Sequence, residues 1–388
     1  MNKDILDILA IAGSESYTLA TVVGTEGSSY RRPGARMLIG DHGRLAGSVS
    51  GGCLERSLVQ RGQWLAAGGP KLLRLSTHAE PDETELAYPG CGGTVEILLE
   101  NLVAAPGHGD DVIGLLRWIR DSRAPAVLAT AIRGSADVPV ASRAAMNADG
   151  HRLGAGGATL WTLCQRQLER ALSERTSFTH RYVVAGGEVE VWMEYIAPAR
   201  ELLLCGRHHD VAPVVEMAHL LGWQVTVAAG TNEADQLGRP DAIIEPTGAS
   251  VTGWTRTRPG AAVVIMTHSL ALDRQLLGAL LGDDEVAKDL AYLGLLGPRH
   301  RTDDILDELA REGLPLSAAA RARLRAPVGL DLGGDGPAAV ALSLTAEIQA
   351  VWSQRNARPL VERAHASASD AQAQRPPPGD QGHVQQAS

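Results

Sequence analysis

The stretch ELLLCGRHHDVAPVVEMAHLLGWQVTVA, residues 201–228, carries the pattern that decides the fold. A short apolar run ends at Gly206, a segment of mixed polarity covers 210–222, and a second apolar run follows at 223–228. The middle segment places four small apolar side chains on one helical face: Val211, Val214, Val215 and Ala218. A strand, a glycine turn, a one-sided helix and a second strand make a βαβ unit, in which the two strands are parallel.

The alternation of strands and helices continues beyond this unit to residue 355. Further apolar runs predict strands at 241–246, 261–268 and 291–297, and amphipathic segments predict helices at 272–282, 302–312 and 336–355. Strands joined by crossover helices form a doubly wound, mostly parallel sheet. We therefore expect an α/β protein in which residues 198–356 form a Rossmann-like domain.

Residues 1–197 predict a different, mixed α/β domain. Its strands are expected at 19–27, in two segments within 35–52, and at 71–78, 93–102, 125–134 and 188–197, with helices from residue 54, at 109–123 and at 159–174. Residues 357–388 contain few large apolar side chains, so we expect a disordered tail there.

Composition excludes several classes of function. The chain has 36 Lys and Arg against 45 Asp and Glu, a net charge of -9, which argues against a nucleic-acid partner held by phosphate attraction. No window reaches the roughly 20 apolar residues that span a bilayer. The acidic N-terminus has no basic lead or cleavage site, so we expect a cytoplasmic protein whose four cysteines are reduced. None of them forms a CxxC pair, which disfavours a structural zinc site.

The loop after the first strand of residues 201–228 departs from the dinucleotide-binding fingerprint. Gly206 supplies the tight turn, but His208 and Val211 stand where the second and third glycines are expected. The acid that binds a ribose is also missing after the second strand. NAD(P) binding is therefore disfavoured, although the helix N-terminus, with His208 or His209, still favours an anion. The alternative is that both histidines are solvated loop residues.

A second loop, GLLGPRHR, follows the strand expected at 291–297. Arg299 and Arg301 precede a helix for which Thr302 is the expected cap. Guanidinium groups beside helix N–H donors favour a phosphate or a carboxylate. Surface ion pairing of the arginines is the alternative.

Three glycine-rich stretches stand out in the N-terminal half: GSSYRRPGARM (27–37), SGGCLE (50–55) and PGCGGTVE (89–96). The first gathers three arginines, and each of the others places a cysteine, Cys53 or Cys91, at a bend. A thiol near arginines has a lowered pKa and more thiolate, the form that binds soft metals or carries sulfur. The alternative is that each cysteine is a small buried apolar residue.

These stretches together resemble the XdhC/CoxI family of maturation factors for molybdenum hydroxylases such as xanthine dehydrogenase. In the C-terminal half the resemblance rests on LLLCGRHHDVAPVVEMAHLLGWQVTV, VVIMTHSLALDRQLL, YLGLLGPRHR and PVGLDLGGDGPAAVALSLTAEI. It implies a non-catalytic chaperone that binds the molybdenum–pterin cofactor, shields it while its terminal sulfur is installed, and delivers it to an apo molybdenum hydroxylase. A cysteine desulfurase is a further implied partner, and a homodimer is the expected assembly.

The resemblance also implies a set of cofactor-binding residues. Cys53 would lie at a bend facing the cofactor, where it would ligate molybdenum or contact its sulfur, while Arg32 and Arg36 would neutralise the phosphate of the pterin. With the residues of the two anion-binding loops in the C-terminal half, the full set is Arg32, Arg36, Ser50, Gly51, Gly52, Cys53, Glu55, Cys91, Gly92, Gly93, Gly206, His209 and Arg299.

Two other functions stay open on the residues alone. An NAD(P)-dependent oxidoreductase would use the Rossmann-like half, against which the missing second glycine counts. An interaction scaffold would use the arginine patches and the tail, and it gives no account of the cysteines framed by glycines. Where family members have GAG and THD, this chain has Gly206-Arg207-His208 and Thr267-His268-Ser269. These departures count against nucleotide binding by this chain and leave the N-terminal motifs intact.

Overall fold

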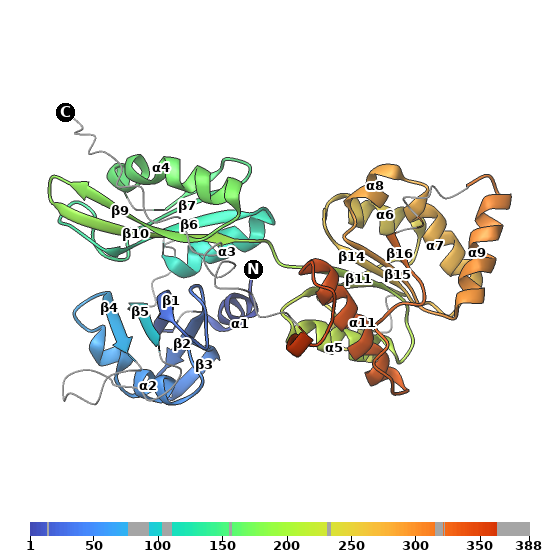
Figure 1. The fold of residues 1–388 in the computed structure, drawn as a ribbon, viewed down its shortest axis with the longest axis horizontal. Helices are drawn as coiled ribbons and strands as arrows, with labels where there is room; N and C mark the ends of the chain where they lie inside the picture. The colour runs from blue at the N-terminus through green and yellow to red at the C-terminus, as the bar shows by residue number, and fades with distance from the viewer. Residues whose placement is uncertain are drawn as a thin grey trace. The chain divides into compact units, whose positions relative to one another are not determined.

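The computed structural model describes residues 1–362 apart from 14, 77–92, 103–110, 155–156, 231–233, 315–320 and 322. The chain divides into two compact units, of which the first comprises Met1–Pro198 and the second begins at Ala199 (Figure 1).

The second unit is built on one parallel sheet of six strands, in the order β13-β12-β11-β14-β15-β16. The strands are β11 Glu201–Cys205, β12 Gln224–Ala228, β13 Ala242–Ile244, β14 Ala262–Ile265, β15 Tyr292–Leu295 and β16 Leu324–Arg325. Connections leave β11 and β14 in opposite directions across the sheet, which is the doubly wound order. The predicted Rossmann-like fold is confirmed.

Helices cover both faces of this sheet (Figure 1). Along β11 the side chains alternate, so Leu202 and Leu204 pack with α5 and α11, whereas Leu203 and Cys205 pack on the opposite face with α6, α7, α8 and α9. The helices are α5 Val211–Leu220, α6 Gly248–Arg256, α7 Leu270–Leu281, α8 Asp284–Asp289, α9 Arg299–Arg311 and α11 Pro337–Trp352, with short 3₁₀ turns η1 Ala234–Leu237 and η2 Leu360–Glu362. Both faces of every central strand are buried, which explains the continuous apolar runs in the sequence.

The first unit contains two antiparallel sheets of five strands each. Their orders are β3-β2-β1-β5-β4 and β8-β7-β6-β10-β9. The strands are β1 Tyr17–Gly27, β2 Arg36–Gly40, β3 Gly43–Gly47, β4 Lys71–Ser76, β5 Gly93–Leu102, β6 Ala126–Arg133, β7 Arg143–Asn147, β8 Arg152–Leu153, β9 Phe178–Val184 and β10 Gly187–Ile196. The mixed α/β class predicted for this half is confirmed.

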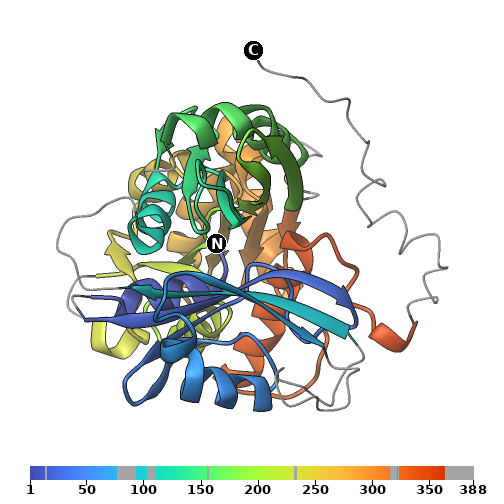
Figure 2. The ribbon, with the colours of Figure 1, turned by 90° about the vertical axis from the view of Figure 1, so that its left-hand side faces the viewer.

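The described residues of the first unit also form four helices: α1 Lys3–Ile11, α2 Cys53–Leu65, α3 Val112–Ser122 and α4 Gly157–Glu174. The apolar side of α2 packs on the first sheet and that of α4 on the second, while α1 and α3 share one apolar cluster with residues of both sheets. Figure 2 turns this unit toward the viewer and shows β1 and β5 side by side in the first sheet.

The sequence analysis missed three strands in the first unit: β7, β8 and β9. Strands β7 and β8 are only five and two residues long, and in β9 half-buried and exposed residues alternate without a fully buried position. Short segments and edge strands carry little apolar periodicity, which is why the pattern of residues 135–197 predicted one helix and one strand only.

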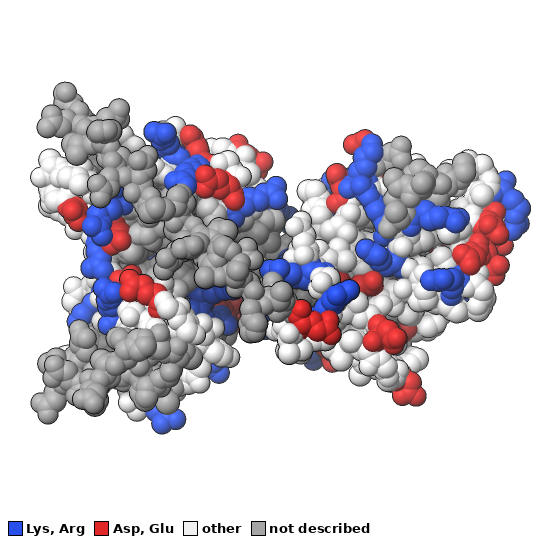
Figure 3. Space-filling model, viewed as in Figure 1, with Lys and Arg blue, Asp and Glu red and all other residues white. Residues whose placement is uncertain are grey.

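The remaining expectations concern the tail, membranes and charge. Residues 363–388 of the expected disordered tail lie outside the described residues. Among the described helices, none combines the length and apolar character needed to cross a membrane. On the face shown in Figure 3, basic and acidic side chains are interspersed over both units.

Candidate functional site

Three glycine-rich segments of the first unit meet at one end of the first sheet. Gly27, the last residue of β1, pairs with Gly93, the first residue of β5. A Cβ atom on Gly93 would lie 2.3 Å from the carbonyl oxygen of Ser28, and one on Gly51 would lie 3.9 Å from the ring of Tyr30. The segment 27–34 therefore contacts both the start of β5 and the segment before α2. We call these three segments the loop cluster.

Cys53 is the first residue of α2, so the bend expected before it is a helix N-terminus. Gly52 precedes it with φ 136° and ψ -65°, a conformation that a side chain would strain. A Cβ atom on Gly52 would meet nothing within 4 Å, and Gly51 and Gly52 are both exposed. The first turn of a helix offers unpaired N–H groups and a positive dipole end, which favour anions and stabilise thiolates.

Glu55 fastens the segment before α2. One carboxylate oxygen, Oε1, accepts hydrogen bonds from the Ser48 hydroxyl (2.7 Å), the Val49 N–H (2.9 Å) and the Ser50 N–H (3.1 Å). The side chain of Glu55 is only 13 % exposed. Glu55 and Ser50 therefore help to hold the conformation of the segment before α2.

The arginines of the loop cluster have three different environments. Arg31 pairs with Asp4, whose pKa burial raises although the guanidinium opposes the shift. Arg32 is exposed, and among the described residues it has no ion-pair partner within 4.0 Å. Arg32 thus lies at the surface of the loop cluster, and its role at a phosphate stays a prediction.

Arg36 does not have the role expected of it. Its side chain is 1 % exposed, and its two terminal nitrogens hold the two carboxylate oxygens of Glu194, with Nη1 to Oε1 at 2.8 Å. Nη1 also donates to the carbonyl oxygen of Gly34 at 3.0 Å. A guanidinium whose donors are buried in this way does not reach a phosphate, so Arg36 is a structural support of segment 27–34.

Cys91 and Gly92 lie outside the described residues, and Gly93 is buried at the start of β5. Among the described side chains, no group of three or more His, Cys, Asp or Glu residues is arranged to hold a metal ion. That Cys53 ligates molybdenum stays a prediction.

The second unit has a pocket of about 520 Å³ at the carboxyl ends of β11, β12, β13 and β14. This is the topological switch point, where doubly wound sheets bind ligands. Gly206 lines this pocket and packs closely on the neighbouring backbone, because a Cβ atom there would lie 2.6 Å from the Met266 carbonyl oxygen. The ring of His208, at the position of the missing second glycine, lies edge-on to the ring of His268, with centroids 4.9 Å apart.

A buried carboxylate orients His268. Asp210 is 7 % exposed, and its Oδ2 lies 2.7 Å from His268 Nε2. His268 itself has a positive φ of 59°, uncommon for a residue other than glycine. In the sequence, His268 could be found as a candidate only because the pair Thr267-His268 follows a buried strand. Nothing in the sequence indicated that His268 contacts Asp210, 58 positions away.

The other predicted residues of this unit lie outside that pocket. His209 is exposed and does not line it. Arg299 is exposed and is the first residue of α9, which begins three residues earlier than predicted, with Pro298 rather than Thr302 at the cap. Arg301 is held by Asp273 at 2.5 Å, and Asp273 also accepts from the Thr267 hydroxyl at 2.5 Å.

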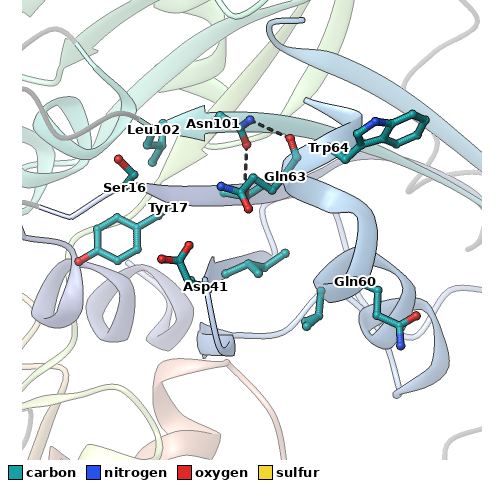
Figure 4. Close-up of a pocket in the computed structure, with 12 residues that line it drawn as sticks. Ser16, Tyr17, Asp41, Gln60, Gln63, Trp64, Asn101 and Leu102 are labelled. Carbon is teal, nitrogen blue, oxygen red and sulfur yellow. Dashed lines mark hydrogen bonds between the residues drawn. The ribbon is translucent and has the colours of Figure 1, made fainter. Parts of the chain in front are cut away.

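A further pocket of about 410 Å³ lies at the opposite end of β1 from the loop cluster (Figure 4). The Asn101 amide bridges the Thr18 hydroxyl (2.8 Å) and the Gln63 carbonyl oxygen (2.9 Å), and Trp64 is 76 % exposed. None of the predicted site residues lines this pocket. The Asn101 side-chain amide in it is already hydrogen-bonded to other residues of the chain.

Both units match models of known protein families. Residues 10–76 match the sequence model of the XdhC and CoxI family, and residues 202–348 match that of the XdhC Rossmann domain. The chain is 25% identical over 352 residues to a probable xanthine dehydrogenase subunit from Bacillus subtilis, covering 89% of this chain and 95% of that protein. It is 29% identical over 187 residues to the uncharacterized protein YqeB of Escherichia coli, covering 47% of this chain and 33% of that one.

A solved structure agrees with these matches. The crystal structure of a xanthine dehydrogenase from Bacillus halodurans superposes with a TM-score of 0.65 at 25% identity, covering 92% of this chain and 97% of that one.

Proposed function

The chain belongs to the XdhC and CoxI family, and from this premise we propose that it is a maturation factor that binds the molybdenum–pterin cofactor and delivers it to an apo molybdenum hydroxylase of the xanthine dehydrogenase type. The observation that carries the proposal is the loop cluster, in which segments 27–34, 50–53 and the start of β5 meet. The role is a non-catalytic one, and a cysteine desulfurase is a further partner that we propose.

The residues of the loop cluster suit a flat, anionic ligand. Gly51 and Gly52 are exposed and carry no side chain, so a ring system can approach the backbone there. The first turn of α2 and the exposed Arg32 supply donors for a phosphate. Tyr30, which is 70 % exposed beside Gly51, offers an aromatic face. When bound, the cofactor would supply a molybdenum centre to which a sulfur ligand can be added.

The test is the pterin and molybdenum content of the protein. Wild type, Cys53→Ala and Arg32→Ala are purified anaerobically from a host that makes molybdenum cofactor, then oxidised for fluorescence detection of the pterin. We expect near-stoichiometric pterin and metal in wild type and a clear loss in both variants. Arg166→Ala is the matched control, because Arg166 is an exposed arginine on α4, away from the loop cluster. Full occupancy in Cys53→Ala would refute the role of the thiol.

An NAD(P)-dependent oxidoreductase is the second candidate, favoured by the pocket at the switch point of the second unit. His208 and the pair Ala228-Ala229 at the end of β12 count against it, because they replace residues that a dinucleotide uses. If wild type holds no pterin where a known cofactor chaperone retains it, calorimetric titration with NADH and NADPH decides this alternative.

A further inference from the structure

The first unit contains the same structure twice. The elements α1-β1-β2-β3-α2-β4-β5 and α3-β6-β7-β8-α4-β9-β10 follow one another in the same order. The two sheets, β3-β2-β1-β5-β4 and β8-β7-β6-β10-β9, also agree strand for strand. We call residues 3–102 the first repeat and residues 112–196 the second repeat.

The strand register matches the two repeats residue by residue. In the first repeat, Thr21 of β1 is opposite Arg36, and Leu19 is opposite Glu100. In the second repeat, Thr130 of β6 is opposite Arg143, and Leu128 is opposite Glu194. The pairing therefore makes Arg36 the counterpart of Arg143, and Glu100 the counterpart of Glu194, without any alignment of sequences.

Sequence and backbone geometry agree with this correspondence. Leu-Ala-Thr recurs at 19–21 and 128–130, and Gly-x-Val-Glu recurs at 93–96 and 187–190. The Gly34 N–H donates to the Val22 carbonyl oxygen at 2.8 Å, and the Ala141 N–H donates to the Ala131 carbonyl oxygen at 2.8 Å. Gly34 and Ala141 both have positive φ, 98° and 67°.

Two buried ion pairs connect the repeats reciprocally. Arg36 of the first repeat holds Glu194 of the second, and Arg143 of the second repeat holds Glu100 of the first. Each arginine also donates to the carbonyl oxygen two residues before it, that of Gly34 or Ala141, at 3.0 and 3.1 Å.

An apolar cluster lies beside these ion pairs and is equally reciprocal. It joins Val23 and Leu98 of the first repeat to their counterparts Ile132 and Trp192 of the second. Exchange of identical contacts in this way is the property of a two-fold dimer interface. The two repeats thus form an interface of that kind within one chain.

The two repeats differ at the end that carries the loop cluster. Helix α4 begins Gly157-Ala158-Thr159, without a cysteine in its first turn. Its burial pattern matches that of α2 so that the buried Cys164 corresponds to the core residue Leu58. Ala185 precedes the glycine pair Gly186-Gly187, where the first repeat has Cys91 before Gly92-Gly93.

The exposed arginine is also specific to the first repeat. Arg32 accepts a backbone hydrogen bond from Ala35, as Pro139 does from Ser142, so Pro139 stands at the position of Arg32. Both cysteines and this arginine are therefore found in the first repeat alone.

We propose that the first unit is an internal pseudo-dimer with a single ligand-binding end, and that Glu194 of the second repeat is the positioning residue for that end. Glu194 fixes the Arg36 guanidinium, which in turn fixes the Gly34 carbonyl at the end of segment 27–34. The carboxylate also lies against Gly34 directly, since a Cβ atom there would be 3.1 Å from Oε1. The identity of the ligand rests on the proposed function, but the positioning role does not.

The reciprocal pairs supply a matched experiment. Glu194→Gln and Glu100→Gln each leave one buried guanidinium facing a neutral amide, so we expect similar losses of thermal stability. Amide hydrogen exchange is then followed in peptides 27–36 and 134–143 of the full chain. We expect Glu194→Gln to accelerate exchange about tenfold in 27–36 only, and Glu100→Gln to do so in 134–143 only. Arg36→Lys and Arg143→Lys repeat the comparison with the charge kept, should a glutamine variant fail to fold.

Pterin retention is measured in the same samples. Loss in Glu194→Gln together with retention in Glu100→Gln supports a single ligand-binding end. Equal loss of pterin in both variants overturns the proposal of a single ligand-binding end. Unchanged amide exchange in 27–36 of Glu194→Gln overturns the positioning role of Glu194. If the two variants show the crossed exchange pattern but the wild-type protein holds no pterin, the positioning role of Glu194 stands and the proposed function is refuted instead.

Discussion

Removal of the Glu55 carboxylate tests how the segment before α2 is held. Its Oε1 accepts three hydrogen bonds, two of them from backbone N–H groups that have no other acceptor among the contacts described. A hydrogen bond to a charged group contributes about 1.5–3 kcal/mol. Because the three share one oxygen, their contributions do not add, and we expect Glu55→Ala to lower the free energy of unfolding by about 2–4 kcal/mol.

The assay is thermal unfolding of the full chain, with hydrogen exchange in the peptide 47–56. For a unit of this size, each kcal/mol lowers the midpoint by about 2–4 °C, so Glu55→Ala should lose roughly 4–16 °C. Glu55→Gln keeps an oxygen acceptor without the charge and should lose about 1 kcal/mol. Pterin retention should fall in the order wild type, Glu55→Gln, Glu55→Ala.

Arg44→Ala separates the hydrogen bonds from the ion pair. Arg44 lies 3.7 Å from the other carboxylate oxygen of Glu55 and is 54% exposed, so its pair contributes about 1 kcal/mol or less. We expect this control to resemble wild type. The reasoning is refuted if Glu55→Ala unfolds within about 1 °C of wild type and exchange in 47–56 is unchanged.

Two further predictions concern the thiols and the second unit. Burial raises the pKa of Cys164 to about 11 and, with the Asp273 charge, that of Cys205 to about 12, so at pH 8 the reactive thiolate is at most about one part in a thousand of either. We expect iodoacetamide to modify at most two thiols per folded chain at pH 8 and all four after denaturation, and mass spectrometry that finds either buried cysteine modified in the folded protein would contradict this. Asp273→Asn leaves Arg301 without its carboxylate and should destabilise the second unit by about 3 kcal/mol, at the low end for a buried pair because Arg301 is 26% exposed. Urea unfolding measures this loss, with the exposed pair variant Arg256→Ala as control, and equal midpoints for the two variants would show that the pair is not stabilising.

Local pattern was enough to predict the fold class of the second unit and its central strands. The central strands there are buried on both faces and the longer helices on one, so continuous apolar runs and a period of 3.6 residues are visible in the sequence. The short elements α6, α8 and β16 were not predicted, because segments of two to nine residues carry little periodicity. The first unit was predicted less completely, because β7, β8 and β9 are short or lie near the sheet edge. The internal repeat was present in the sequence as Leu-Ala-Thr and Gly-x-Val-Glu, each found twice, but matches of three or four residues carry little weight without the register of the strands.

Arg36 shows the limit of reasoning from residues to a site. Beside Arg31 and Arg32 in a glycine-rich stretch, it has the composition of an anion site. Its partner Glu194 is 158 positions away and stands in a strand that is otherwise mostly apolar.

The sequence by itself determined the α/β class, the Rossmann-like second unit and the gathering of glycines, arginines and cysteines into three motifs. It did so because local periodicity and backbone freedom are properties of neighbouring residues. Only the tertiary structure decided which arginine faces solvent, which carboxylate orients His268, and that the first unit pairs two copies of one fold. Those features depend on contacts between strands and loops distant in the chain, and burial, which sets whether a charge is available to a ligand, exists only once those contacts form.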